Sequence, residues 1–442
     1  MISREPIIRV GIFERRKEIR GELKGPFALN DSVSIEGQFK AQYDDAGIAF
    51  TAAGVFKLMK QAEINCRPLE DGPFVLKDVV IGVQFHWERK EDQSFGGSLR
   101  IIRDGDRTMA AVNEIAVEEY LKSVISSEMS ATAPIELLKA HAITSRSWLV
   151  AMLEREQKNI GIPPQLSRQS ENEIIRWYDR EDHSLFDVCA DDHCQRYQGV
   201  SKIISKAAND AIEATRGVFL VNEDKICDAR YSKACGGLSE NFENTWEEKH
   251  VPYLTSVSDS MIEHPPLKTE GEVERWILGS PEAYCNTTDG RILKQVLPSF
   301  DQETTDFFRW KVKHKREELE ELVKTKSGID FGTIINLQSV QRGVSGRIIK
   351  LRIEGSNRTL TVGKELEIRR WLSKSHLYSS AFVVKTERDS KGIPTRFVFH
   401  GAGWGHGVGL CQIGASVMAT KGFKAEEIVK HYFRGAQLMK LY

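Results

Sequence analysis

The sequence has almost no net charge, few cysteines and no long apolar run, and each of these absences excludes a class of protein. Its 442 residues carry 62 lysines and arginines against 63 aspartates and glutamates, a net charge of −1. Overall charge therefore does not favour nucleic acid or an anionic membrane as a partner. Seven cysteines in a chain of this length do not make a disulfide framework. We also expect no transmembrane segment.

The first residues, MISREPIIRV, lack the apolar core of a secretory signal peptide. We therefore expect either a cytoplasmic protein or one whose leader precedes this sequence. The sequence shows no internal repeat and no low-complexity tail. Its length suits roughly two or three domains, or one large domain with insertions.

Residues 1–112 are expected to form a β-rich N-terminal region. Ile7–Phe13 and Val79–Trp87 are runs of β-branched and aromatic residues, and the second run alternates as one face of a strand does. Asp104-Gly105-Asp106 separates two further strand-like runs and predicts a hairpin turn. This region contains no catalytic constellation, so we expect it to serve as a platform or a binding surface.

Two helices are predicted on either side of Glu128. Apolar residues recur at helical spacing over 117–125 and again over 135–153, and Pro134 suits the first turn of the second helix. Glu128 lies between them among small and apolar residues, where little would solvate a carboxylate. Such a place favours the protonated form that a general acid needs. The alternative interpretation is a capping or salt-bridged glutamate.

Two histidines and two cysteines lie within a dozen residues, at His183, Cys189, His193 and Cys194. Imidazole and thiolate are the ligands that tetrahedral zinc prefers, and four of them form a closed, structural site. The spacing is not that of a zinc finger, and the adjacent His193 and Cys194 require a tight bend. We predict a structural zinc site here, the alternative being ordinary histidines and free thiols in a loop.

The second half of the chain alternates helical and strand-like patterns. A helix is predicted over Ser201–Ala214 with Ser201 as its N-cap, and a strand over Val218–Val221. The region from about 261 to 387 is expected to be a mixed α/β insertion. Within it the patterns indicate a helix over 304–324 and strands over 334–341, 347–354 and 380–388. Two closing helices are predicted over 413–419 and 425–432.

A glycine-rich stretch, Gly401-Ala-Gly-Trp-Gly-His-Gly-Val-Gly409, alternates glycine with other residues. It lacks the Lys-Ser/Thr of a P-loop and the spacing of a dinucleotide site. Trp404 can stack on a sugar ring, and His406 and Gln412 can hydrogen-bond its hydroxyls, so we predict a sugar-binding cleft. A packing loop without a ligand is the alternative. Cys235-Gly236-Gly237 is a second place where paired glycines would admit a ligand or a backbone.

Several of these stretches together resemble the stage II sporulation protein D/LytB family, called SpoIID-like. The resemblance rests on YLKSVISSEMSATAPIELLKAHAITSRSWL, HSLFDVCADDHCQRYQG, YSKACGGLSENFENTWEEKHVPYLTSV, SGRIIKLRI with IRRWL, and HGAGWGHGVGLCQIGASVMATKGFKAEEIVKHYFRGAQL. It extends over about residues 113–442. The best-studied members of this family are peptidoglycan lytic transglycosylases, and its LytB-like branch is described as enhancers of a cell-wall amidase.

The resemblance implies an α+β fold and a role in the cell envelope. Residues 113–442 would form a catalytic region of helices packed on antiparallel strands, completed by the glycine-rich loop and the closing helices. Glu128 would be the catalytic acid/base, and the two histidines and two cysteines would bind zinc. The substrate would be peptidoglycan glycan outside the cytoplasmic membrane, and a cell-wall amidase is a candidate partner. The expected substrate-binding residues are Ser127, Arg146, Cys235, Gly236, Trp404, His406 and Gln412.

The sequence departs from the family pattern at three positions. Ser130 stands where the family usually has proline, and could loosen the turn that positions Glu128. Cys235 stands where the family often has serine, and Cys411 where it commonly has serine or asparagine. Cys235 therefore places a thiol near the expected site.

One carboxylate is enough for a lytic transglycosylase, whereas glycoside hydrolysis usually needs two. Glu128 would protonate the glycosidic oxygen and then, as carboxylate, accept the proton of the muramic acid 6-hydroxyl, giving a 1,6-anhydro end. Two other classes stay open. One is a non-catalytic, glycan-binding enhancer of an amidase. The other is a thiol enzyme, with Cys235 as nucleophile and His406 as base. Two of Cys227, Cys235 and Cys285 could also form a disulfide if the protein is exported.

Overall fold

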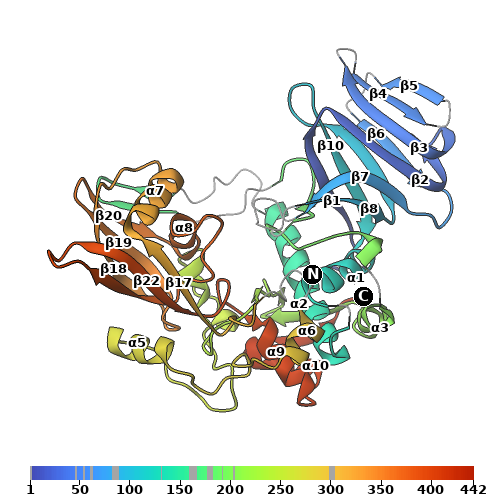
Figure 1. Ribbon diagram of the computed structural model, residues 1–442. Coiled ribbons are helices and arrows are strands. Elements are labelled where there is room, and N and C mark those ends of the chain that lie inside the picture. The colour runs from blue at the N-terminus through green and yellow to red at the C-terminus, as the bar shows by residue number, and fades with distance from the viewer. Residues whose placement is uncertain are drawn as a thin grey trace. The chain divides into compact units, whose positions relative to one another are not determined.

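The computed structural model describes most of the chain and divides it into two units (Figure 1). The described residues are 2–44, 47–52, 55–59, 63–81, 89–130, 132–158, 167–176, 183–191, 193–202, 205–297 and 304–442. The first unit comprises Met1–Arg146, Asp182–Phe219 and Lys440–Tyr442, and the second comprises Ser147–Glu181 and Leu220–Met439. The domain boundary predicted at residue 112 lies within a strand of the first unit, and the division into independent domains stays a prediction.

The first unit is built on an eleven-stranded sheet, so the predicted β-rich N-terminal region and the α+β class are confirmed. All its strand pairs are antiparallel except that of β13 with β1. The strands are β1 (Ile7–Arg16), β2 (Glu18–Leu29), β3 (Val33–Asp44), β4 (Gly47–Ala52), β5 (Val55–Met59), β6 (Glu63–Pro68), β7 (Phe74–Ile81), β8 (Arg89–Phe95), β9 (Ser98–Arg103), β10 (Met109–Ala116) and β13 (Val188–Cys189).

Two of the predicted strand features can be compared directly with this sheet. The turn at Asp104–Asp106 joins β9 to β10, and the N–H of Asp104 donates to the carbonyl of Thr108 at 2.9 Å. The strand predicted over Val79–Trp87 agrees with β7 as far as Ile81, and its remaining residues lie outside the described ranges.

The predicted helix pair is confirmed as α1 (Val117–Glu128) and α2 (Ile135–Lys158). Helix α1 follows β10 directly and buries the apolar face that its spacing predicted. The helix predicted over Ser201–Ala214 is wrong in its start. A short 3-10 turn, η1 (Val200–Lys202), comes first, and α3 (Lys206–Ala214) begins later because the Ser205 side chain caps it, accepting from the N–H of Ala207 at 3.0 Å.

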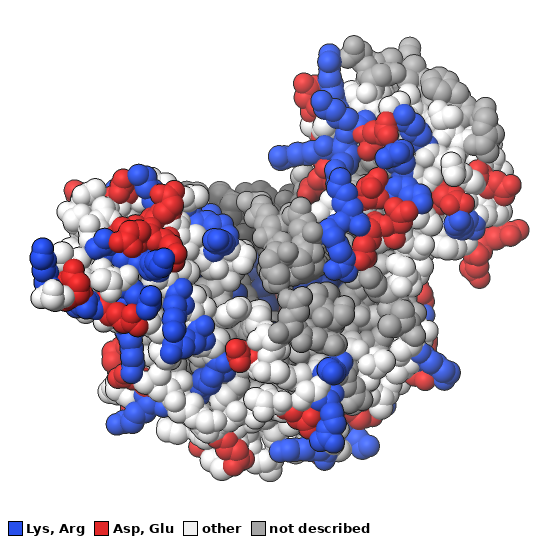
Figure 2. All heavy atoms as spheres, in the orientation of Figure 1, with Lys and Arg blue, Asp and Glu red and all other residues white. Residues whose placement is uncertain are grey.

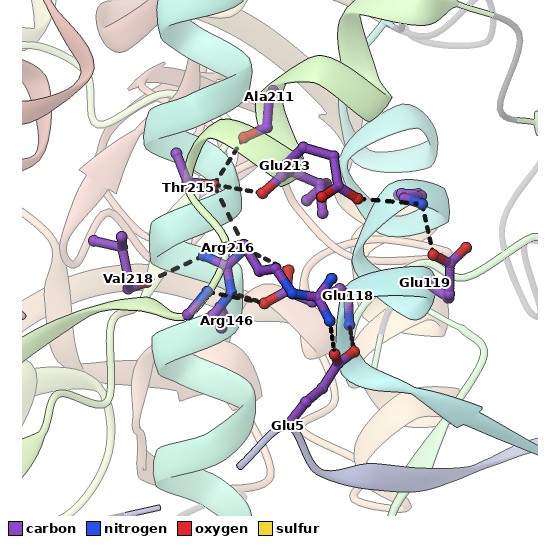
Figure 3. Close-up of polar contacts among 12 residues, drawn as sticks. Glu5, Glu118, Glu119, Arg146, Ala211, Glu213, Thr215, Arg216 and Val218 are labelled. Atoms are coloured by element: carbon purple, nitrogen blue, oxygen red, sulfur yellow. Dashed lines mark hydrogen bonds and ion pairs between the residues drawn. The ribbon is translucent and has the colours of Figure 1, made fainter. Parts of the chain in front are cut away.

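A buried ion pair joins α1 to α2 (Figure 3). Arg146 and Glu118 both have fully buried side chains, and two guanidinium nitrogens donate to the two carboxylate oxygens at 2.9 and 2.6 Å. Arg146 also donates to the carbonyl of Val218 at 3.1 Å. The Glu118 carboxylate further accepts from the N–H of Gly217 at 3.1 Å and the hydroxyl of Tyr442 at 2.8 Å. The pair therefore links both helices to the strand after α3 and to the C-terminal residues.

Among its described residues, the second unit contains one sheet of five strands, two of three strands and one of two strands. Helix α8 packs on β19 and β20, and α7 packs on α8, β17 and β22, around a core that includes Trp310 and Trp371 (Figure 1). The strands are β11 (Arg168–Gln169), β12 (Glu173–Ile175), β14 (Val218–Asn222), β15 (Lys225–Ile226), β16 (Tyr231–Ser232), β17 (Arg309–Lys315), β18 (Ile334–Arg342), β19 (Ile348–Gly355), β20 (Thr359–Gly363), β21 (Phe382–Arg388), β22 (Pro394–Ala402), β23 (Leu410–Cys411) and β24 (Gln437–Lys440). The helices are α4 (Phe242–Thr245), η2 (Pro252–Leu254), α5 (Glu270–Leu278), α6 (Gly290–Val296), α7 (Arg316–Ser327), α8 (Glu365–Trp371), α9 (Gln412–Thr420) and α10 (Ala425–Tyr432).

The helix predicted over 304–324 is wrong in its first half. Residues Arg309–Lys315 form β17, which pairs with β22, and only Arg316–Ser327 are helical. The alternation of Trp310, Val312 and His314 is a period of two, which the charged lysines between them concealed. The strands predicted at 334, 347 and 380 and the two closing helices are confirmed as β18, β19, β21, α9 and α10.

Charge on the visible face of each unit is mixed rather than of one sign. Figure 2 shows lysine and arginine interspersed with aspartate and glutamate, as expected from the net charge of −1. Among the described residues, no helix combines the length and the apolar character needed to cross a membrane.

We expect replacement of Arg146 by methionine to lower the free energy of unfolding by about 3–5 kcal/mol, because Glu118 is left as a buried charge without its partner. Lys139→Met, in the same helix, removes the partly exposed pair with Glu136 and should cost less than about 1 kcal/mol. Denaturant unfolding of both variants measures the difference. Equal costs for the two would contradict the importance assigned to the buried pair.

The same pair predicts a dependence of stability on pH. Burial alone would raise the pKa of Glu118, but its hydrogen bonds and ion pair with Arg146 outweigh burial and hold the pKa below its usual value. A carboxyl group with a depressed pKa stabilises the fold above its unfolded pKa, about 4.3, and loses this contribution as the pH falls through the folded value. Unfolding between about pH 6 and pH 3 should therefore show a steeper loss of stability for the wild type than for Glu118→Gln. Parallel curves would contradict this.

Candidate functional site

Glu128 is the last residue of α1 and is half-buried. The backbone N–H of Arg196 donates to its Oε1 at 2.9 Å. Glu128 ends a helix, and both its acid/base role and the alternative of a capping or salt-bridged glutamate stay predictions. The neighbouring Ser127 is buried, and its hydroxyl has no hydrogen-bond partner among the described residues. The carboxyl group is thus oriented by a main-chain donor from a distant segment.

That segment contains the predicted metal ligands, which the fold brings together in the first unit. One ligand atom from each of His183, Cys189, His193 and Cys194 lies within 4.8 Å of all the others. Cys194 Sγ is 3.5 Å from His183 Nε2 and 3.5 Å from His193 Nδ1, and Cys189 Sγ is 4.0 Å from the same His193 nitrogen. Sulfur and nitrogen on one tetrahedral zinc ion are about 3.5–3.6 Å apart, given the usual bond lengths. The donor set therefore fits a single metal ion.

Hydrogen bonds fasten the segment from 183 to 198, here called the ligand loop, to the sheet and to α1. The Asp187 carboxylate accepts from the Arg9 guanidinium at 2.8 Å, instead of orienting an imidazole as an outer partner would. Tyr197 donates to Asn113 Oδ1 at 2.6 Å, and the N–H of Gln198 donates to the Ser123 hydroxyl at 3.1 Å. A metal ion in the ligand loop would therefore stiffen the backbone that holds Glu128.

Thiolate character is favoured at one of these ligands. The hydrogen bond with Cys194 holds the pKa of the Cys189 thiol far below its usual range, against the opposing effect of burial, and the two imidazoles act in the same direction.

The glycine-rich loop belongs to the second unit, and only some of its predicted sugar-binding side chains are accessible. Trp404 is half-buried, with its ring stacked on Phe307 at a centroid distance of 4.8 Å and tilted against Tyr378 at 4.4 Å. Its backbone exchanges hydrogen bonds with Ala234 at 2.7 and 3.0 Å. A sugar would have to stack on whatever part of the indole these aromatic rings leave uncovered.

His406 is neutral in this loop. Burial lowers its pKa well below the usual value, and the positive charges of Arg230 and Arg347 add to the effect. Its Nδ1 accepts from the N–H of Val408 at 3.0 Å, so the proton of the neutral ring lies on Nε2. The ring also hydrogen-bonds the backbone of Tyr231, so a hydroxyl group would have to share or displace that contact.

Four of the other predicted substrate-binding residues are almost inaccessible. Cys235 and Gln412 are 2% exposed, Ser127 is 4% exposed and Arg146 is fully buried. Gly236 is buried as well. The Arg146 guanidinium group donates its hydrogen bonds to Glu118 and to the carbonyl of Val218. These contacts inside the protein do not support its expected role in binding substrate. The substrate-binding role of the remaining residues stays a prediction.

The hypothesis of a thiol enzyme gains nothing from the structure. Cys235 Sγ lies 3.8 Å from Cys285 Sγ, and its described polar neighbours are other thiols and the Asp259 carboxylate, not His406. The seven cysteines are all free, so no predicted disulfide is formed.

Arg347, which the sequence did not single out, holds the glycine-rich loop by hydrogen bonds to backbone carbonyls. It is buried and donates to the carbonyls of Gly405 at 3.2 Å and Cys235 at 3.1 Å. A Cβ at Gly407 would lie 2.2 Å from its guanidinium carbon. The only hint in the sequence was a single arginine at the start of a predicted strand.

We expect Gly407→Ala to destabilise the protein more than Gly422→Ala. Both glycines have a positive φ, so each variant costs about 1 kcal/mol in backbone strain. A Cβ at Gly422 would meet nothing within 4 Å, whereas at Gly407 it must displace a buried, hydrogen-bonded arginine. Thermal unfolding of the two variants checks this. An equal loss of stability in both would show that Arg347 can move aside at no cost.

Comparison with known protein families assigns two parts of the chain. Residues 105–222, which contain Glu128 and all four residues of the histidine–cysteine cluster, match the family described as Stage II sporulation protein. Residues 240–409 match a domain of unknown function, DUF8618.

Several curated proteins are similar over most of this chain. Stage II sporulation protein D of Bacillus subtilis (strain 168) is 26% identical over 330 residues, which are 74% of this chain and 76% of that protein. An uncharacterized protein of Brachyspira hyodysenteriae is 26% identical over 343 residues, 78% of this chain and 72% of the relative. The amidase enhancer of Bacillus subtilis is 24% identical over 79% of this chain, which spans only 46% of that longer protein. These matches, with the Glu128 helix pair and the histidine–cysteine cluster inside the matched region, support a SpoIID-like family for this chain.

Proposed function

We propose that this protein cleaves the glycan strands of peptidoglycan as a lytic transglycosylase, with Glu128 as its acid and base. The observation that carries the proposal is the hydrogen bond from the N–H of Arg196 to Glu128. It fixes the carboxyl group at the end of α1, within the region that matches the stage II sporulation protein family. A backbone N–H orients the carboxyl group without adding a formal charge of its own.

The chemistry needs one residue that changes role during the reaction. Glu128 protonates the oxygen of the bond between N-acetylmuramic acid and N-acetylglucosamine as that bond breaks. The resulting carboxylate accepts the proton of the muramic acid 6-hydroxyl while that oxygen bonds to C1, which leaves Glu128 protonated again. The nucleophile is part of the substrate, so proximity replaces a bound water and no second carboxylate is required.

We propose that the histidine–cysteine cluster holds a zinc ion with a structural role. All four donors belong to the protein, so no coordination position is left for substrate or water. When bound, the ion would cross-link the ligand loop. The contribution of the chain's own residues is to connect that loop to Glu128 through Arg196 and to α1 through Gln198.

The expected substrate suggests where the protein acts, and one of its relatives suggests a second candidate function. Peptidoglycan lies outside the cytoplasmic membrane, so we place the protein in the cell envelope. The similarity to a protein named amidase enhancer favours, as the alternative, a glycan-binding role that stimulates a cell-wall amidase. Trp404 and His406, the half-buried residues of the glycine-rich loop, are our candidates for glycan contact in either case.

We expect the wild-type protein to release products with 1,6-anhydro-muramic ends from peptide-free glycan strands. Glu128→Gln should reduce their formation by a factor of about 10²–10⁴, because it removes the transferable proton. Glu119→Gln is a matched control in the same helix, since Glu119 is exposed and pairs only locally with Lys122 in the contacts described. Mass spectrometry of the digests measures the products.

The other outcomes of this experiment discriminate between the candidates. Reducing ends in place of anhydro ends would mean a hydrolase with a second carboxylate. No cleavage by a folded, zinc-loaded wild type would exclude the lytic transglycosylase. Stimulation of an amidase that Glu128→Gln leaves intact would then establish the enhancer function.

A further inference from the structure

A second cluster of metal-ligating side chains lies in the interior of the second unit, apart from the residues used above. Cys235, Asp259, Cys285 and Cys411 each place one ligand atom within 4.8 Å of all the others. All four residues are at most 2% exposed. They come from four separate segments, of which β16 and β23 are paired next to Cys235 and Cys411. Neither the proposed catalytic chemistry nor the histidine–cysteine cluster involves them.

We propose that these four residues bind a single zinc-like divalent cation in a closed, tetrahedral, structural site. Three thiolates select soft or borderline metals such as zinc, and the carboxylate completes the tetrahedron. The 3.8 Å between Cys235 Sγ and Cys285 Sγ equals the edge of about 3.8 Å that two thiolates share on one zinc ion. An iron–sulfur cluster would hold the thiolates on different irons and therefore further apart.

Burial raises the pKa of the Asp259 carboxyl group well above its usual value, and the hydrogen bonds around it only partly oppose this effect. Oδ1 accepts from the Tyr432 hydroxyl at 2.5 Å, and Oδ2 accepts from the N–H of Cys285 at 2.8 Å. Among the described residues, no lysine, arginine or histidine forms an ion pair with this buried carboxylate. A buried carboxylate without a counter-ion is costly, and a divalent cation would supply the missing charge.

The surroundings of Cys411 favour a thiolate. Its sulfur accepts from the N–H of Gly414 at 3.4 Å and from the N–H of Cys235 at 3.3 Å. Cys411 is also the N-cap of α9, where the positive end of the helix dipole stabilises a negative sulfur. A Cβ at Gly414 would lie 2.1 Å from Asp259 Oδ1, so only glycine lets this helix approach the carboxylate.

Two arginines, the half-buried Arg309 and the buried Arg347, would offset part of the charge of the occupied site. Three thiolates and a carboxylate around a divalent cation leave a net charge of about −2. Arg309 donates to the carbonyl of Gly236 at 3.1 Å and Arg347 to that of Cys235 at 3.1 Å, next to the cluster. The charge of Arg347 is shared with the Glu240 and Glu365 carboxylates, which also interact with it electrostatically.

The first test measures how many zinc ions are bound per chain in the purified protein and in variants, by elemental mass spectrometry. His183→Ala/Cys189→Ser removes two ligands of the first cluster and should still retain about one zinc ion per chain. Adding Cys285→Ser should remove that ion, whereas adding Cys227→Ser should not, because Cys227 is equally buried but lies outside the cluster. A folded His183→Ala/Cys189→Ser variant without bound metal would overturn the proposal.

Cobalt substitution keeps the test decisive if the Cys285 variant fails to fold. Cobalt in the His183→Ala/Cys189→Ser background should give thiolate charge-transfer bands and the visible absorption of a tetrahedral site. Alkylation without reduction, followed by peptide mass spectrometry, tests the competing possibility of a disulfide. A Cys235–Cys285 disulfide in protein that lacks the second metal would overturn the proposal. Because all these readouts are independent of glycan cleavage, they hold whether or not the proposed enzymatic function does.

Discussion

The buried ion pair between Glu118 and Arg146 is the constraint on which the rest of the first unit depends. Two charges removed from water are tolerated only when each is fully hydrogen-bonded, and here the partners come from both helices, from Gly217 and Val218, and from Tyr442. This requirement fixes the register of α1 against α2. Glu128 lies at the far end of α1, so its position is set by an interaction three turns away.

The helical periodicity of the sequence predicted where Glu128 lies but did not predict that Arg146 is buried, because Arg146 is buried by a network of polar contacts between distant residues. Helical periodicity and small residues predicted the helix pair and the carboxylate between its helices. Periodicity cannot reveal that an arginine on the second helix turns inward, because arginine is almost always exposed unless it is paired. The partner, Glu118, is 28 positions away and looks like an ordinary acidic residue of a first helical turn.

The same contrast separates the two metal-type clusters. The histidine–cysteine cluster was predictable because its four residues are dense in sequence, and rare residue types close together seldom arise by chance. Cys235, Asp259, Cys285 and Cys411 are spread over 177 positions, and only the pairing of β16 with β23 and the packing of α9 bring them together. From sequence, Cys235 and Cys411 were merely departures from a family pattern. Their convergence on one buried carboxylate gives both departures a common physical explanation.

The alternating glycines of the glycine-rich loop are compatible with two roles, close packing of the backbone and contact with a glycan. Its alternating glycines are explained largely by close packing: a Cβ would meet the Trp310 ring at Gly401, backbone at Gly403 and Gly409, and Arg347 at Gly407. The residues between them are of two kinds, since Ala402 and Val408 are buried whereas Trp404 and His406 are only half-buried. The glycines therefore need no ligand to account for them, and the argument for glycan contact rests on Trp404 and His406 alone. Because the His406 ring is neutral, it is not suited to bind an anionic group as a charged partner.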